Sequence, residues 1–300
     1  MTGRKEWDGR TKAGSSGIRF FMILIRYLGI YPAYFTLLFV AAIYTLIDAG
    51  LRRNLRAYRN RLGLTTDIFN IYGHTLAFGH AMIDRFAYLL LRRQPFRFTG
   101  IGEEQLVEAL QKQKGLIILA AHIGNQEVSG DVLYARIRTR VNYLMLDNEK
   151  SDIRKVIEKA SGGRNVNIIP TNADDIEMAL KVKQALENNE IVCMLGDRVM
   201  GNESFLEIPF LGKNARYPTY PFEIAALTGS PVITTSTVKT GLRSYRFRVF
   251  DYIPFDNVSR SNRKAYIREA MQKYVAILEK IVTEYPRQWF NFYDYWEEFS

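Results

Sequence analysis

The side chains best suited to acid–base chemistry in this 300-residue chain are those of His122 and Glu127, which follow a short apolar run. A neutral imidazole can take a proton from a hydroxyl group, and a neighbouring carboxylate can hold it in one tautomer. On one continuous helix, residues five apart face different sides, but Gly124 and Asn125 allow a turn that brings Glu127 back toward the ring. We therefore predict that His122 is a general base oriented by Glu127. The alternative is a strand-to-helix connection with a surface histidine and a glutamate favoured by the helix dipole.

The elements that position this pair are a strand and a helix. Residues 116–121 are all apolar, and a short unbroken apolar run predicts a buried strand of a parallel sheet covered on both faces. Helical spacing resumes over 126–136. In an open α/β sheet the crevice beyond the carboxyl ends of the strands binds ligands, so His122 is expected to lie at such a crevice.

Strand and helix patterns alternate through the rest of the chain. The predicted strands are 116–121, 141–146, 166–169, 191–196, 205–208, 231–238 and 245–252. The predicted helices are 103–113, 126–136, 151–160, 173–188, 215–228 and 261–284. This alternation predicts an α/β fold with a mostly parallel sheet flanked by helices. Within it, the apolar–polar alternation of 245–252 predicts a half-exposed antiparallel strand.

The N-terminal part of the chain is polar over residues 1–17 and mostly apolar over 18–47, unlike the rest. We therefore expect a flexible lead-in over 1–17, a membrane-associating apolar segment with a basic flank over 18–63, and an α/β domain over 64–300. No charge occurs from Tyr27 to Ile47, which is long enough for a membrane helix of about 20 residues. Pro32 interrupts the run, so a bent helix or a shallow hairpin competes with a straight span. Arginines on both flanks suit an element whose two ends remain at the cytoplasmic surface. A buried core helix of a soluble protein is the alternative.

The charge and the motifs of the chain argue against a nucleic-acid-binding protein: the net charge is +10, but the arginines are dispersed and no nucleic-acid-binding motif is present. The expected partners of this basic surface are anionic lipid headgroups or an acidic carrier protein. The single cysteine, Cys193, lies in an apolar strand and is expected to be a buried hydrophobe. His74 and His80 have no cysteine or carboxylate at ligand spacing, which predicts packing or surface roles. We predict neither a metal site nor a cofactor.

Four segments carry a family resemblance: His122 and Glu127 with four residues between them, Gly196-Asp197-Arg198, Ile208-Pro209-Phe210-Leu211-Gly212 and Tyr285-Pro286-Arg287-Gln288-Trp289. In this order the chain resembles the late acyltransferases of lipid A biosynthesis, which belong to the wider glycerolipid acyltransferase superfamily. The resemblance implies transfer of a fatty acyl chain from an acyl thioester of acyl carrier protein or CoA to a hydroxyl or amine of a lipid acceptor. It also implies a place on the cytoplasmic face of the bacterial inner membrane.

The same resemblance assigns further residues. Asp197 and Arg198 correspond to the family's contacts with the acceptor's polar head, Arg164 lies near another family arginine, and Asn125 is expected to shape the substrate or oxyanion site. Since the sequence has no Gly-x-Ser-x-Gly elbow, direct attack by the acceptor is favoured over a covalent enzyme intermediate.

The chain departs from the family after Trp289, where an acidic and aromatic tail replaces basic residues. Such a tail favours a less anionic acceptor than a phosphorylated disaccharide. A non-catalytic lipid-binding protein that retains the fold is the alternative function.

Overall fold

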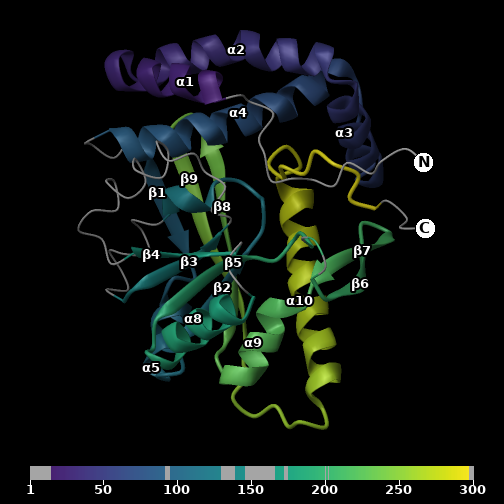
Figure 1. Ribbon diagram of the computed structural model, residues 1–300. Coiled ribbons are helices and arrows are strands. Elements are labelled where there is room, and N and C mark those ends of the chain that lie inside the picture. The colour runs from purple at the N-terminus through teal and green to yellow at the C-terminus, as the bar shows by residue number, and fades with distance from the viewer. Residues whose placement is uncertain are drawn as a thin grey trace.

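The computed structural model describes residues 15–91, 95–129, 139–145, 166–171, 175–199, 201 and 203–296. Four N-terminal helices form a layer over one end of a seven-stranded sheet, and the remaining described helices pack on the sheet (Figure 1). The expectation of an α/β fold with a mostly parallel sheet is confirmed.

The N-terminal layer consists of α1 (Ser15–Leu28), α2 (Ile30–Ile47), α3 (Ala49–Arg61) and α4 (Ile68–Leu90). The apolar run breaks at Gly29, whose φ of +85° is in the left-handed region that favours glycine. The break expected at Pro32 is therefore wrong: this proline lies in the first turn of α2, where its missing N–H breaks no helical hydrogen bond. Asp48 ends α2 and starts α3, where its side chain accepts a hydrogen bond from the backbone N–H of Leu51.

The large sheet has the strand order β1-β9-β8-β2-β5-β3-β4. Its strands are β1 (Arg97–Ile101), β2 (Leu116–Ala120), β3 (Val141–Met145), β4 (Val166–Pro170), β5 (Ile191–Leu195), β8 (Val232–Gly241) and β9 (Ser244–Ile253). All neighbours pair in parallel except β8 and β9, which form an antiparallel hairpin. The antiparallel strand expected over 245–252 is thus confirmed, and its exposed and buried residues alternate.

Alternate residues of β2 face two separate hydrophobic clusters, as the two-residue period of a strand requires. Ile117 and Leu119 pack with residues of α8 (Asp175–Glu187), α9 (Tyr220–Thr228) and α10 (Arg263–Glu284). Leu116 and Ile118 pack on the other face with α5 (Glu104–Gln111). The sheet is therefore covered on both faces, which explains why β2 has no polar residue.

Two helix predictions need correction. The helix expected over 215–228 begins only at Tyr220, because residues 213–218 form β7 (Lys213–Pro218), which pairs with β6 (Phe205–Phe210). The helix expected over 126–136 begins as a short 3₁₀ helix, η1 (Gln126–Ser129), and its remainder lies outside the described residues, as does the predicted helix 151–160.

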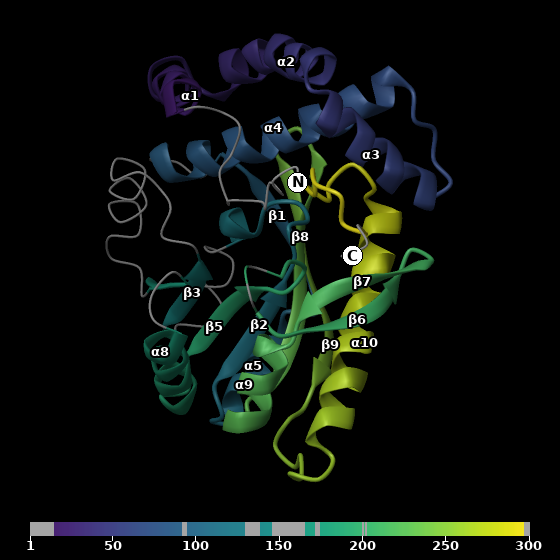
Figure 2. The same ribbon diagram turned by 45° about the vertical axis from the view of Figure 1, so that its right-hand side comes forward.

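The aromatic tail after α10 is part of the core. Figure 2 shows the chain beyond α10 running back beneath α3 and α4. Trp289 and Trp296 are buried and pack against Phe210, at ring-centroid distances of 5.3 and 5.9 Å. The tryptophans of this segment therefore stabilise the fold around the carboxyl ends of β2 and β5.

Candidate active site

The candidate site lies where β2 and β5 end. These neighbouring strands are parallel and pair Ala120 with Leu195. His122 and Asp197 each follow two residues later, so the shared register brings them side by side. Nδ1 of His122 lies 2.7 Å from Oδ1 of Asp197, and the backbone N–H of His122 donates to Oδ2 at 3.1 Å. The sequence places both residues at strand ends, but their pairing depends on β2 and β5 being neighbours.

Asp197 is completely buried, and four hydrogen bonds hold it. Besides the two from His122, Nε1 of Trp289 donates to Oδ2 at 3.2 Å and the hydroxyl of Tyr295 donates to the backbone carbonyl at 2.7 Å. This position differs from the sequence-based expectation, because a fully buried carboxylate cannot contact the polar head of an acceptor. The sequence analysis missed the contact of Asp197 with His122 because β2 and β5 are far apart in the chain.

The electrostatics of the pair define the proton positions. Burial alone would raise the pKa of Asp197, but attraction to His122 and Arg198 and the hydrogen bonds from His122 lower it to about 2. The carboxylate is therefore ionised at neutral pH and can only accept, so Nδ1 of His122 carries a proton. Burial is also the main reason that the pKa of His122 lies below its usual value, with Asp197 opposing and Arg198 adding to this shift. A neutral imidazole thus has its lone pair on Nε2.

The backbone around His122 is fastened to the C-terminal segment. Residues 123 and 289 form an antiparallel bridge, Phe290 N–H donates to the carbonyl of His122 at 2.8 Å, and Gly124 N–H donates to the carbonyl of Gln288 at 2.7 Å. Gly124 has a φ of +66°, and a Cβ atom there would lie 2.0 Å from the carbonyl oxygen of Thr237. Only glycine fits at this close approach, which shapes the loop that carries His122.

The other predicted residues occupy different places. The side chain of Asn125 is buried and donates to the carbonyl of Ala81 at 2.8 Å, so it ties the His122 loop to α4. Arg198 donates to the carbonyl of Phe290 at 2.7 Å, with its guanidinium 5.5 Å from the ring centroid of Tyr293. The side chain of Glu127 and the whole of Arg164 lie outside the described residues, so their roles stay predictions.

The other titratable residues do not belong to this pair. His74 is fully buried, with Nε2 2.9 Å from the carbonyl of Trp289, which confirms a packing role. Burial raises the pKa of the Cys193 thiol to about 12, so it is not a thiolate nucleophile. Within the described ranges, no three histidine, cysteine or acidic side chains are arranged to hold a metal ion.

A cavity of about 380 Å³ lies beside the His122 loop, between α4, the β8–β9 hairpin and residues 287–290. Its lining includes the apolar side chains of Leu76, Leu242 and Phe290 and the basic side chains of Lys239 and Arg287. Lys239 is paired with the carboxylate of Asp84, so the positive charge of the lining comes mainly from Arg287, which donates to the neutral side chain of Asn70.

The chain is similar to several known proteins. A phosphatidylinositol mannoside acyltransferase from two strains of Mycobacterium tuberculosis is 25% identical over 160 residues, or 53% of this chain and 49% of the relative. The chain thus matches about half the length of these curated relatives. The 1-acyl-sn-glycerophosphate (LPA) acyltransferase PlsC of Thermotoga maritima aligns with 80% of this chain and 95% of its own, at 13% identity and a TM-score of 0.38.

The family comparison covers most of the chain. The family model described as bacterial lipid A biosynthesis acyltransferase matches residues 75–298, which include β2, β5, His122, Asp197 and the C-terminal tryptophans. We conclude that the chain belongs to the bacterial lipid A biosynthesis acyltransferase family.

Proposed function

We propose that this protein is a membrane-associated acyltransferase that moves a fatty acyl chain from an acyl thioester to a hydroxyl or amine of a lipid acceptor. The donor is acyl carrier protein or CoA, and the acceptor is a lipid A precursor or a related bacterial lipid. The observation that carries the proposal is the contact of His122 Nδ1 with the buried, ionised carboxylate of Asp197. Family membership supports the acyl-transfer chemistry.

In the proposed reaction, Nε2 of His122 removes the proton from the acceptor's hydroxyl or amine. The oxygen or nitrogen of the acceptor attacks the carbonyl carbon of the thioester at the same time. The tetrahedral intermediate then collapses, the C–S bond breaks, and the thiolate takes the proton from the imidazolium. The products are an acylated lipid and a free thiol. Asp197 stabilises the imidazolium and holds the tautomer, a role that the sequence analysis assigned to Glu127. Glu127 remains a second candidate for contact with His122.

Arg198 is the candidate for a charge contact near the reacting atoms. Burial is the main cause of the lowered pKa of His122, and the positive charge of Arg198 adds to this lowering. A guanidinium in this position can neutralise an oxyanion or bind a phosphate of the acceptor. The nearby cavity beside Gly124 supports binding of a lipid next to the same loop.

Membrane association, including a place on the cytoplasmic face of the bacterial inner membrane, is part of the proposal. Within the described part of the chain, α2 is the one helix long and apolar enough to cross a membrane by length and composition. Such an element would bring the enzyme to a lipid acceptor.

The decisive experiment compares lipids by mass spectrometry in cells that express the wild-type chain or His122→Ala, followed by assays of the purified proteins with acyl carrier protein and CoA thioesters. In cells that express the variant, we expect one lipid class to lack an acyl group. The circular dichroism spectrum of the purified variant should match that of the wild type, which shows that the variant is folded. The control variant Lys264→Ala alters an exposed residue of α10 and should keep full activity. Full activity in His122→Ala would refute the mechanism, and no turnover with any donor in the wild type would favour the non-catalytic lipid-binding alternative.

A further inference from the structure

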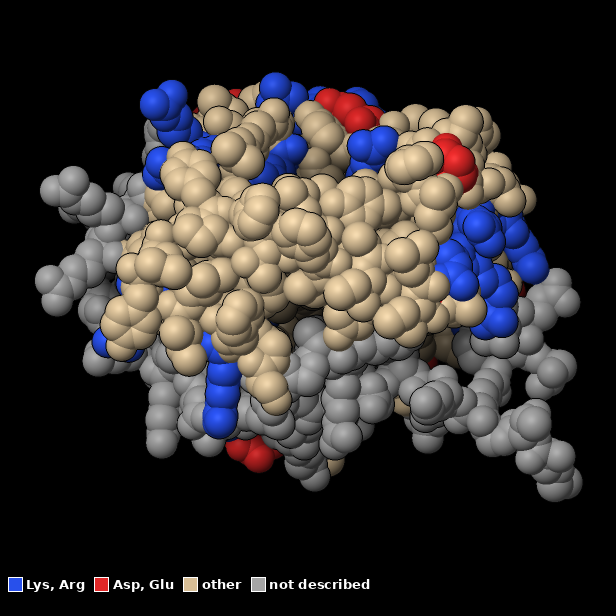
Figure 3. All heavy atoms as spheres, turned by 90° about the horizontal axis from the view of Figure 1, so that it is seen from above, with Lys and Arg blue, Asp and Glu red and all other residues tan. Residues whose placement is uncertain are grey.

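The outer surface of α1 and α2 is apolar and exposed along its whole length. Figure 3 shows a broad, mostly uncharged surface across these helices, with a few basic side chains at its margins and a cluster of them toward α3. The large apolar side chains exposed on it are those of Phe20, Ile23, Tyr27, Leu28, Tyr31, Phe35, Leu38, Phe39, Ile43, Leu46 and Ile47. Contiguous apolar surface of this extent marks an interaction surface.

The inner surface of α2 is packed onto the protein from its first turn to its last. Its buried residues are Ile30, Ala33, Tyr34, Leu37, Ala41 and Thr45. Leu37 fills the space left by the missing side chain of Gly79 on α4, where a Cβ atom would lie 2.3 Å from Leu37 Cδ1. The hydroxyl of Tyr34 donates to the buried carboxylate of Asp84 on α4, which also pairs with Lys239 of β8.

This packing is incompatible with α2 crossing a bilayer. A span of 18 residues is about 27 Å long and would have to stand along the membrane normal, with lipid around it. Since α2 packs on α4 through Tyr34, Leu37 and Leu38, a spanning α2 would carry the Asp84–Lys239 pair and the end of the β8–β9 hairpin into the hydrocarbon. Buried charges and open strands are not tolerated there.

We propose that α1 and α2 lie flat in one leaflet of a bilayer containing anionic lipid, with their outer surfaces at the boundary between headgroups and acyl chains. This extends the membrane association proposed above by specifying the geometry, and it is independent of the reaction chemistry. Helices that lie in the interface bury their apolar face about 5–10 Å deep. The two helices and α4 then form a platform between the lipid and the sheet.

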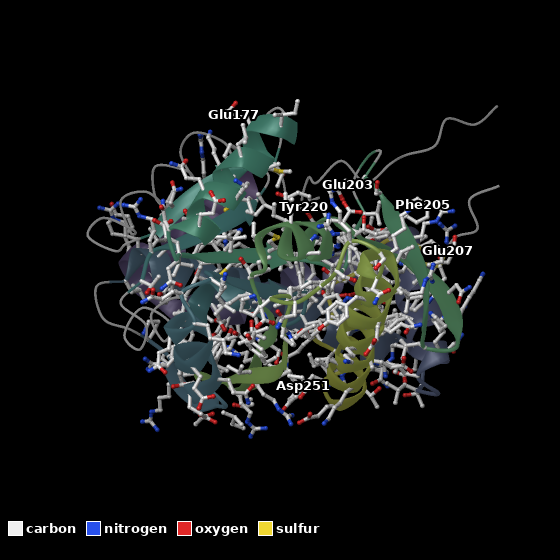
Figure 4. All side chains as sticks on the ribbon, turned by 90° about the horizontal axis from the view of Figure 1, so that it is seen from below. Glu177, Glu203, Phe205, Glu207, Tyr220 and Asp251 are labelled. Carbon is white, nitrogen blue, oxygen red and sulfur yellow. The ribbon has the colours of Figure 1, made fainter. Side chains whose placement is uncertain are left out.

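The charge distribution favours an anionic bilayer over a second protein copy. Residues 15–66 contain seven arginines and a single acidic residue, Asp48, which caps α3. Four of these arginines are exposed: Arg19, Arg26, Arg53 and Arg56. On the opposite side of the molecule, Figure 4 labels exposed carboxylates at Glu177, Glu203, Glu207 and Asp251. This polarity would orient the protein with α1 and α2 toward negatively charged headgroups.

Depth measurements along α2 test the geometry. The full-length chain with Cys193→Ala carries one spin label at a time, at Tyr31→Cys, Phe35→Cys or Leu46→Cys, in vesicles of phosphatidylcholine and phosphatidylglycerol. We expect all three labels at one shallow depth within a few ångströms of each other. A spanning helix would separate Tyr31 from Leu46 by about 22 Å along the membrane normal. A label at Arg268→Cys, on the exposed side of α10, should remain in water. A depth gradient along α2 would overturn the in-plane geometry while leaving membrane association standing.

Vesicle sedimentation tests the charge contribution. Arg53→Ser with Arg56→Ser should weaken binding to the same vesicles by about 30-fold, whereas the matched pair Lys264→Ser with Arg268→Ser on α10 should leave it unchanged. Equal binding by both pairs, or no binding by the wild type, would overturn the proposal. The proposal would also be overturned if, in the absence of lipid, the protein formed a dimer in which the two Phe35→Cys labels contact each other and are shielded from water. Because these measurements need no turnover, they do not depend on the outcome of the activity assays.

Discussion

Nδ1 of His122 lies 2.7 Å from Oδ1 of Asp197, although 75 residues separate the two in the chain. The contact joins the ends of two neighbouring parallel strands, and the side chain of His122 remains 27% exposed while that of Asp197 is fully buried. His122 can therefore reach a substrate, whereas Asp197 can act on the substrate only through His122. This division of roles, and the packing around the pair, can be tested by substitution and by titration.

Replacing Asp197 with Asn should abolish most of the activity. The amide cannot stabilise an imidazolium and can offer an N–H to Nδ1, which would move the imidazole proton to Nε2 and remove the base. We expect kcat to fall by about 10³–10⁴-fold with little change in KM, measured in the acyl-transfer assay. Asp251→Asn alters an exposed carboxylate of β9 and serves as the control with unchanged rate. A loss of less than tenfold in Asp197→Asn would show that Asp197 is not the orienting residue.

Trp289→Phe should change the basicity of His122 without displacing it. The variant removes the Nε1–H bond to Oδ2 of Asp197, so the carboxylate becomes more basic, attracts the imidazolium more strongly and raises the pKa of His122. The chain has three histidines, so NMR of isotope-labelled imidazoles can follow this titration directly. The acid limb of the pH–rate profile should move to higher pH as well.

Trp296→Phe is the matched control for this experiment. Its Nε1–H donates to the carbonyl of Phe210 and not to Asp197. The missing hydrogen bond should lower the free energy of unfolding by about 1 kcal/mol in Trp296→Phe, where the acceptor is a neutral carbonyl, and by about 1.5–3 kcal/mol in Trp289→Phe, where it is a carboxylate. Only Trp289→Phe should shift the titration of His122. Identical shifts in the two variants would mean that Trp289 acts through packing alone.

Gly124→Ala should distort the loop that carries His122. The new methyl group would lie 2.0 Å from the carbonyl oxygen of Thr237, in addition to the cost of the positive φ. We expect at least a 100-fold loss of activity and several kcal/mol of destabilisation. Gly212→Ala separates the two effects, because Gly212 has a φ of +81° but a methyl group added there would meet nothing within 4 Å. It should cost only about 1 kcal/mol and leave the rate unchanged. Equal effects in the two variants would contradict the steric argument.

Because His74 is buried in its neutral form, the free energy of unfolding should fall when the pH is lowered. Burial is the main cause that lowers the pKa of His74 from 6.5 to about 4 in the folded chain. Between these values the unfolded chain binds a proton that the folded chain does not, so the free energy of unfolding falls as pH decreases from 6.5 toward 4. The full contribution is about 3 kcal/mol, present above pH 6.5 and lost below pH 4.

Chemical denaturation of the wild type and His74→Phe at several pH values measures this contribution. The aromatic surroundings of His74, which include Tyr58 and Phe292, can accept a phenyl ring. The variant should be less stable at pH 7, because the bond to the Trp289 carbonyl is lost, but its stability should vary less with pH. The same pH slope in both proteins would assign the acid sensitivity to other groups.

Much of this molecule follows from local sequence patterns. The apolar run 116–121, the alternation of 245–252 and the position of His122 beyond a strand predicted the buried strand, the antiparallel strand and the site edge. These features depend on residues that are neighbours in the chain, because period and turn chemistry act over a few residues. The start of α9 was misplaced because the pairing of β7 with β6 outweighs the helical pattern of 215–218, and only the partner strand shows this.

The site itself depended on contacts between distant segments. The sequence determined that a histidine follows β2 and that an aspartate follows β5, but only the strand order placed them in register. Likewise, the length and apolar character of α2 fit both a spanning and an in-plane helix, whereas its packing on α4 through Tyr34 and Leu37 distinguishes them. The reason is physical: composition sets how much apolar surface a segment must bury, and tertiary structure decides what buries it.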